Sequence, residues 1–136
     1  MPTQKVETKV LVFSWIFQII AAIILGMAAW DKIVGTETSH YVFTTLEMEP
    51  AGRIIIASIE SLAAIMLLST SIPHMGAVLG LGVMMGAIIA HISKLGFDVN
   101  NDGGKMVMMM TVVIFSTIAI IFLHRSRFPM GEKDTD

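Results

Sequence analysis

The chain has 136 residues, of which 54% are hydrophobic and 15% are charged, and its mean hydropathy is +0.76. So apolar a composition is typical of an integral membrane protein and argues against an ordinary soluble domain. The net charge of -2 and the lack of cysteine argue against nucleic-acid binding, a disulfide framework and thiolate redox chemistry.

Four apolar runs are each close to the roughly 20 residues that a helix needs to cross a bilayer. They are Val10 to Trp30, Ile54 to Ile72, Met75 to Ile92 and Met106 to Leu123. Barrel strands are excluded, because such strands alternate in polarity and need only about 10 residues. We therefore predict an all-α membrane protein, a four-helix transmembrane bundle with antiparallel neighbours. Residues 1–136 would form one transmembrane domain with spans at about 10–31, 52–71, 75–95 and 105–124.

The first apolar run follows Lys5 and Lys9, as the core of a signal peptide would. Its apolar stretch is longer than the roughly 7 to 15 residues of that core, so we expect it to remain as a span. The next segment, Asp31 to Arg53, is the only large piece expected outside the membrane. We predict a short interfacial helix near Tyr41 to Leu46, because aromatic residues favour the membrane boundary.

The remaining links are short. Ser69 to His74, with Pro73, is long enough only for a tight turn, which predicts an antiparallel hairpin of the second and third spans. Asn100 to Gly104 has the residues of a turn and too few acidic ligands for a calcium loop.

Four spans place both termini on one side of the membrane. Basic residues are slightly more frequent there, which favours cytoplasmic termini. The basic residues expected on the side of the termini are Lys5, Lys9, Arg125, Arg127 and Lys133, and those expected on the opposite side are Lys32, Arg53, Lys94 and Lys105.

Glu60 is the one charged residue in the second apolar run. A carboxylate in the hydrocarbon region costs free energy, so it must be either protonated or paired with a cation or hydrogen-bond donors. At about 1.5 Å per residue, Glu60 lies about 10 Å below the outer end of its helix and His91 about 6 Å below the end of the next. Lys32 and Asp31 lie at the outer end of the first span, and Gln18 lies on the same small-residue face as Lys32.

These residues predict an outward-facing polar pocket of Glu60, His91, Lys32, Asp31 and Gln18 that binds a ligand or handles a proton. The alternative is that Glu60 bonds to its neighbours only to orient the helices. We expect no metal site, since His40, His74 and His124 lie far apart in this topology. Two GxxxG pairs, Gly76 with Gly80 and Gly82 with Gly86, indicate close packing within the bundle or a dimer face.

Several of these features together resemble the DoxX-like family of small bacterial membrane proteins. They are the end of the first span at Gly26 to Lys32, the acidic position in the second, the stretch Gly86 to Gly96, and the Asn-Asp-Gly-Gly loop before a last span closed by arginines. The resemblance covers about Val10 to Arg127. It implies a multi-pass four-helix bundle in the bacterial cytoplasmic (inner) membrane, with relatives associated with quinone-linked sulfur oxidation or redox-defence partners. Lys32, Glu60 and His91 match the polar positions of the family.

The leading hypothesis is an accessory membrane subunit, without catalytic activity of its own, that binds a lipophilic ligand such as a quinone or a lipid. Its expected partners are membrane lipid and either a protein of a membrane complex or further copies of itself, and not nucleic acid. A second hypothesis is a proton-coupled carrier or channel in which Glu60 titrates. A third is a purely structural subunit.

Overall fold

The computed structural model describes residues 7–128, and these contain helices, turns and loops but no strand. The expectation of an all-α chain is therefore confirmed. Three helical stretches are long and apolar enough to cross a membrane, namely Thr8–Val34, Pro73–Leu95 and Lys105–Leu123. The helix expected as another span, α3 (Ala51–Leu67), has only 17 residues. Length and composition thus support three spans and not yet the predicted four.

Glycine and proline mark several of the helix ends. The first helix, α1 (Thr8–Val34), ends at Gly35, whose φ of 73° is in the left-handed region and whose N–H bonds to the carbonyl of Asp31. The fourth, α4 (Pro73–Ala90), begins with proline in its first turn, where no backbone N–H is required. It continues as a π-helical turn, η1 (His91–Leu95), and α5 (Lys105–Leu123) follows.

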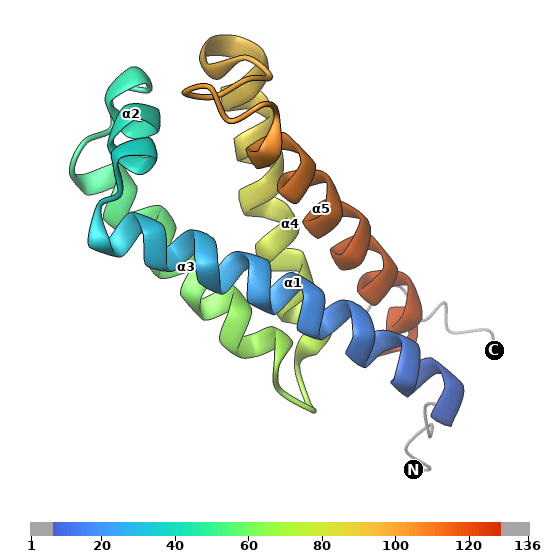
Figure 1. Ribbon diagram of the computed structural model, residues 1–136. Coiled ribbons are helices and arrows are strands. Elements are labelled where there is room, and N and C mark those ends of the chain that lie inside the picture. Colours follow the sequence, from blue (N-terminus) through green and yellow to red (C-terminus); the bar gives the residue numbers. More distant parts are fainter. Residues whose placement is uncertain (1–6, 129–136) are drawn as a thin grey trace, which may run out of the picture.

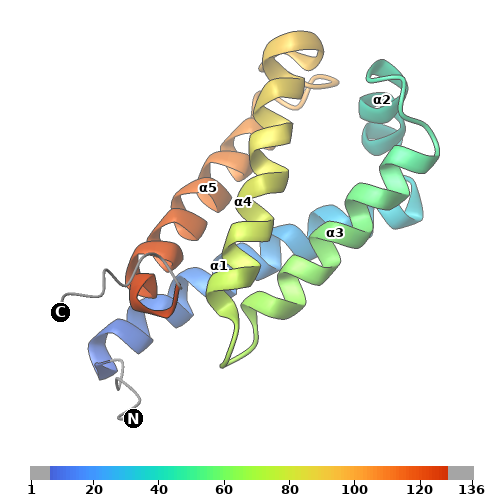
Figure 2. The same cartoon turned by 180° about the vertical axis from the view of Figure 1, so that it is seen from behind.

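The four long helices pack in a ring in which α1 and α4 each contact both α3 and α5. Figure 1 shows α1 in blue crossing in front of α3, with α4 and α5 as a steeper pair beside them. Figure 2, from behind, shows that the α1–α3 pair and the α4–α5 pair diverge toward one end. That wide end carries α2 and η1. The narrow end carries the start of α1, the end of α5 and the turn between α3 and α4.

Helix α2 (Glu37–Thr45) covers part of the wide end. Thr36 caps the start of this helix, because its hydroxyl accepts the N–H of Ser39. The helix is longer than the short interfacial helix that we expected. Its buried face packs Val42 and Phe43 against residues of η1 and the loop after it, Leu95 and Val99. An apolar cluster of these four side chains therefore bridges the two diverging helix pairs.

The core of the bundle consists largely of alanine, with Leu25, Leu67 and Ile120 as its largest apolar members. Small residues allow the helices to approach closely. A Cβ added to Gly76 would lie 2.7 Å from the backbone nitrogen of Leu67, so α3 and α4 touch there backbone to backbone. The Gly76 and Gly80 pair thus packs inside the bundle. At Gly82 and Gly86, by contrast, an added Cβ would meet nothing within 4 Å among the residues that the structure describes.

Two carboxylates bond to the backbone of the loop before α5, and Asp102 accepts most of these hydrogen bonds, whereas Asp98 accepts one from Gly103. Asp102 accepts hydrogen bonds from the backbone N–H groups of Val99, Gly104 and Met106 at 3.1, 2.8 and 3.0 Å. Burial acts to raise the pKa of Asp102, but these donors, with the N–H of Lys105, lower it more and hold it below its ordinary value. The expected turn is thus a cap for the start of α5.

The basic residues counted for membrane orientation divide between the two ends. Arg127, at the narrow end, donates to the carbonyls of Thr70 and Ser71 in the turn between α3 and α4. Lys5 and Lys133 lie outside the described residues.

Candidate functional site

Lys32 and Glu60 form an ion pair between α1 and α3. The Nζ atom of Lys32 lies 3.1 Å from Oε1 of Glu60, and the two side chains are 17% and 3% exposed. Lys32 also donates to the carbonyl of Ala28 at 3.4 Å. Both residues were predicted to belong to one site, and the structure brings them together.

The second carboxylate oxygen of Glu60 is unpartnered. Oε2 is buried and accepts no hydrogen bond from residues 7–128. A buried carboxylate normally accepts several hydrogen bonds, because leaving one lone pair unsatisfied costs about 1–3 kcal/mol. Glu60 therefore offers a buried acceptor next to a lysine that still reaches the surface.

A chain of polar groups connects this pair to the outside. Arg53, in the first turn of α3, donates through Nη1 to the backbone carbonyl of Lys32. Its Nε lies 2.8 and 3.1 Å from the two oxygens of Glu49. Glu49 in turn lies 3.1 Å from Nδ1 of His40, whose side chain is 52% exposed. The network therefore runs from an exposed imidazole to the buried carboxylate.

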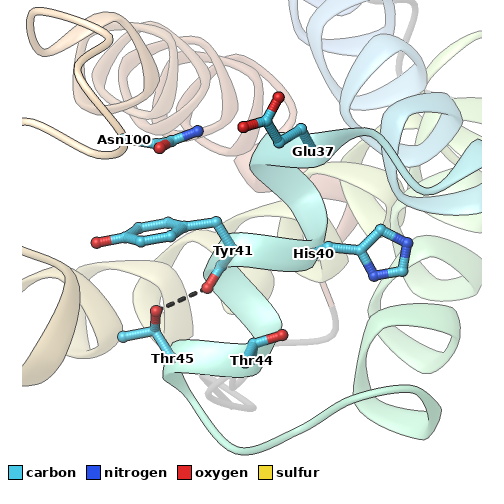
Figure 3. Close-up of a pocket in the computed structure, with 6 residues that line it drawn as sticks. All are labelled: Glu37, His40, Tyr41, Thr44, Thr45 and Asn100. Carbon is cyan, nitrogen blue, oxygen red and sulfur yellow. Dashed lines mark hydrogen bonds between the residues drawn. The ribbon is translucent and has the colours of Figure 1, made fainter.

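An open groove lies beside this network at α2. It is lined by Glu37, His40, Tyr41, Thr44, Thr45 and Asn100. Figure 3 shows the Tyr41 ring extending toward Asn100 while His40 points away from it, and the Thr45 hydroxyl bonds to the carbonyl of Tyr41. None of the residues predicted for the pocket lines this groove. His40 belongs to both the groove and the network.

Two predicted members do not join Glu60. His91 is buried in η1, but its Nδ1 atom lies 3.0 Å from the carbonyl oxygen of Gly96, so the imidazole closes its own turn. Asp31 has an exposed side chain, and its contribution is the backbone carbonyl that receives the N–H groups of Gly35 and Thr36. The expectation that His91 pairs with Glu60 is not met.

Gln18 lies near the other end of the bundle. It precedes Lys32 by 14 residues, which is about 21 Å along a helix. Its amide donates to the carbonyl of Leu67 at 2.7 Å, and its oxygen accepts the hydroxyl of Ser14 at 2.6 Å. Including Gln18 in the outer pocket was therefore wrong, because the prediction compared helix faces and gave too little weight to depth.

A second polar cluster surrounds Gln18. Ser14 Oγ lies 2.6 Å from Nε2 of His124, and the ring centres of His124 and His74 are 6.4 Å apart. His74 and His124 were expected to lie far apart. The structure corrects this, because the start of α4 and the end of α5 meet at the narrow end.

No group of three or more histidine, cysteine, aspartate or glutamate side chains converges as a metal site in the described part of the chain. No family model, curated protein or solved structure matches the chain.

Sequence reasoning missed Glu49, Arg53 and His40 as parts of the site. The first two are four residues apart, a spacing that places opposite charges next to each other on a helix, so that pair could have been found. His40 carries no such signal, because its contact depends on how α2 folds back over α3.

Proposed function

We propose that this protein is a small membrane protein of four spans that binds a lipophilic ligand with a polar head, such as a quinone, at the Lys32–Glu60 pair. Its role is that of an accessory subunit to a membrane oxidoreductase or another membrane complex. The unpartnered, buried Oε2 atom of Glu60 carries the proposal.

The surface of α3 supports a fourth span. The helix and the residue after it present a face of large, exposed apolar side chains, namely Ile54, Ile55, Leu62, Ile65 and Leu68. So continuous an apolar face is unfavourable in water and normal in lipid. At 17 residues, α3 is at the lower limit of about 17–25 residues for a span.

The bacterial inner membrane and cytoplasmic termini complete the proposal. The resemblance to the DoxX-like family suggests the membrane and a redox partner. Arg125 and Arg127, just after α5, support a cytoplasmic narrow end.

The two groups of the pair complement a quinone in both of its oxidation states. The lysine ammonium is a donor for a quinone carbonyl, and the free carboxylate oxygen is an acceptor for a quinol hydroxyl. Because Glu60 is almost fully buried, a donor that reaches Oε2 removes an unsatisfied group as well as forming a bond. A ligand with only an alkyl chain gains neither contact.

Gentle purification followed by native mass spectrometry and lipid extraction tests this proposal. We expect a bound quinone-like molecule in the wild type and its loss in Glu60→Gln, in which the carboxylate acceptor is replaced by an amide. Glu47→Gln is the matched control, because the Glu47 side chain is 85% exposed. The proposal fails if neither a ligand nor a stoichiometric protein partner accompanies the wild type.

The polar chain from His40 to Glu60 favours one alternative, a proton-coupled carrier or channel. The contacts from His40 to the Lys32 carbonyl, and the contact from Lys32 Nζ to Glu60, are each within hydrogen-bond distance. The two sets meet at Lys32, whose carbonyl and Nζ are not themselves in contact, so this alternative requires water between them. In liposomes this alternative predicts pH-driven flux that Glu60→Gln abolishes and Glu47→Gln preserves. Equal flux in both variants excludes it.

A further inference from the structure

The His74–His124 pair at the narrow end is not used by the proposed function. His74 is 9% exposed and His124 is 1% exposed. The Nδ1 atom of each ring is buried and has no hydrogen-bond partner among residues 7–128. Two adjacent buried imidazoles thus each present an unpartnered nitrogen, which is unusual because buried polar atoms are nearly always bonded.

The hydrogen bonds around His124 determine which nitrogen carries its proton. Gln18 donates its amide to Leu67 and so turns its oxygen toward Ser14. The single hydroxyl proton of Ser14 is given to that oxygen, so Ser14 Oγ accepts from the ring. His124 therefore has its proton on Nε2. When the ring is neutral, its Nδ1 atom has a bare lone pair.

This arrangement has the form of a metal ligand with its supporting shell. A metal-binding histidine is neutral and donates its other ring N–H to a fixed acceptor, which orients the ring. Ser14 is that acceptor here, and Gln18 and the Leu67 carbonyl hold Ser14 in turn. We propose that His74 and His124 bind one monovalent copper ion, Cu(I), through their Nδ1 atoms.

The spacing and the charge select the class of ion. In the proposed complex the two Nδ1 atoms face each other across the ion. Two collinear metal–nitrogen bonds of about 2.0 Å, with roughly 1.2 Å from each nitrogen to its ring centre, then place the ring centres about 6.4 Å apart, which matches the observed 6.4 Å. Linear coordination by two ligands is characteristic of Cu(I), and imidazole is a suitable ligand for copper. Zinc prefers four ligands. The nearby Arg127 also disfavours a divalent ion more than a monovalent one.

Anaerobic titration of the detergent-solubilised full chain with Cu(I), in competition with a chromogenic Cu(I) chelator, tests the site. We expect one Cu(I) per chain. His124→Gln retains a donor for Ser14 but lacks Nδ1, and it should weaken binding by more than about 100-fold, beyond the roughly 10- to 100-fold effect of an outer-shell change. His74→Ala should do the same, whereas Ser14→Ala should weaken binding only about 10-fold.

His40→Ala is the matched control, since His40 lies on the exposed face of α2 at the wide end. Its affinity for Cu(I) should equal that of the wild type, and thermal melts should show that each variant is folded. Copper X-ray absorption should show two nitrogen ligands. The proposal is overturned if folded His124→Gln binds Cu(I) as tightly as the wild type, if the wild type binds none, or if the absorption shows sulfur from methionine.

Discussion

Replacing Lys32 by methionine removes the cation of the buried pair and leaves the aliphatic part of the side chain. The carboxylate of Glu60, whose side chain is 3% exposed, then has no counter-charge. Loss of one partner from a buried ion pair costs about 3–5 kcal/mol. Glu60→Gln should cost only about 1 kcal/mol, because Lys32 is 17% exposed and its flexible stem can carry the ammonium toward the surface.

This asymmetry predicts the result of a double-mutant cycle. A neutral amide at position 60 needs no cation, so Lys32→Met with Glu60→Gln should be more stable than Lys32→Met alone. Unfolding in mixed micelles with increasing SDS, followed by far-UV circular dichroism, gives the free energies. Lys94→Met is the control, because the Lys94–Glu47 pair is exposed and should contribute at most about 0.5 kcal/mol.

The interpretation of the pair is refuted if the two single variants cost the same, or if the double variant costs as much as their sum. Either result would mean that Lys32 and Glu60 do not depend on each other in the folded protein. The polar network would then end at Arg53.

Three further predictions concern the loop and the glycines. Asp102→Ala removes the acceptor for three backbone N–H groups at the start of α5, and should lower the free energy of unfolding by about 1–2 kcal/mol in the same SDS assay. The pKa of Asp102 is lower in the folded state than its ordinary value of 3.8, so the stabilisation that Asp102 contributes is present above about pH 4 and is lost on acidification. If the free energies of unfolding of the wild type and of Asp102→Asn fell in parallel as the pH was lowered, this prediction would be wrong. Gly76→Ala places a Cβ 2.7 Å from the Leu67 nitrogen and should lower the free energy of unfolding by about 1–3 kcal/mol. Gly86→Ala, where an added Cβ meets open space, should be neutral or stabilising by up to about 1 kcal/mol. Equal shifts in melting temperature for the two variants would argue against the close contact of α3 and α4.

The helices could be predicted because long apolar runs and their glycine and proline ends carry local physical signals. Glu60 with Lys32 could also be predicted, since a carboxylate in an apolar run requires a partner and Lys32 is a cation at a compatible depth. The predictions that failed concern contacts that the local sequence does not determine. The π-helical turn at η1, in which the N–H of Gly96 bonds to the carbonyl of His91, also brings the Gly96 carbonyl to 3.0 Å from the His91 ring, and regular 3.6-residue periodicity gives no sign of such a turn.

The contact between His74 and His124 could not be predicted from the sequence either. The two residues are separated by 50 positions in the sequence, and each taken alone is one histidine at a helix end. Only the antiparallel packing of α4 against α5, together with the rotation of both helices, brings the rings together. The lengths of the links indicate which helices are neighbours. The rotation of each helix about its own axis depends on how all four long helices pack together.

The apolar cluster between α2 and η1 has a mechanical consequence. At the narrow end the helix pairs are held by backbone contact at Gly76, which is rigid, while at the wide end they are joined across the gap through Val42, Phe43, Leu95 and Val99. We therefore expect the two pairs to be held more firmly at the narrow end than at the wide end. A large-to-small change at one of those four residues should therefore alter the separation of the helix pairs at the wide end more than a similar change near Gly76 alters it at the narrow end.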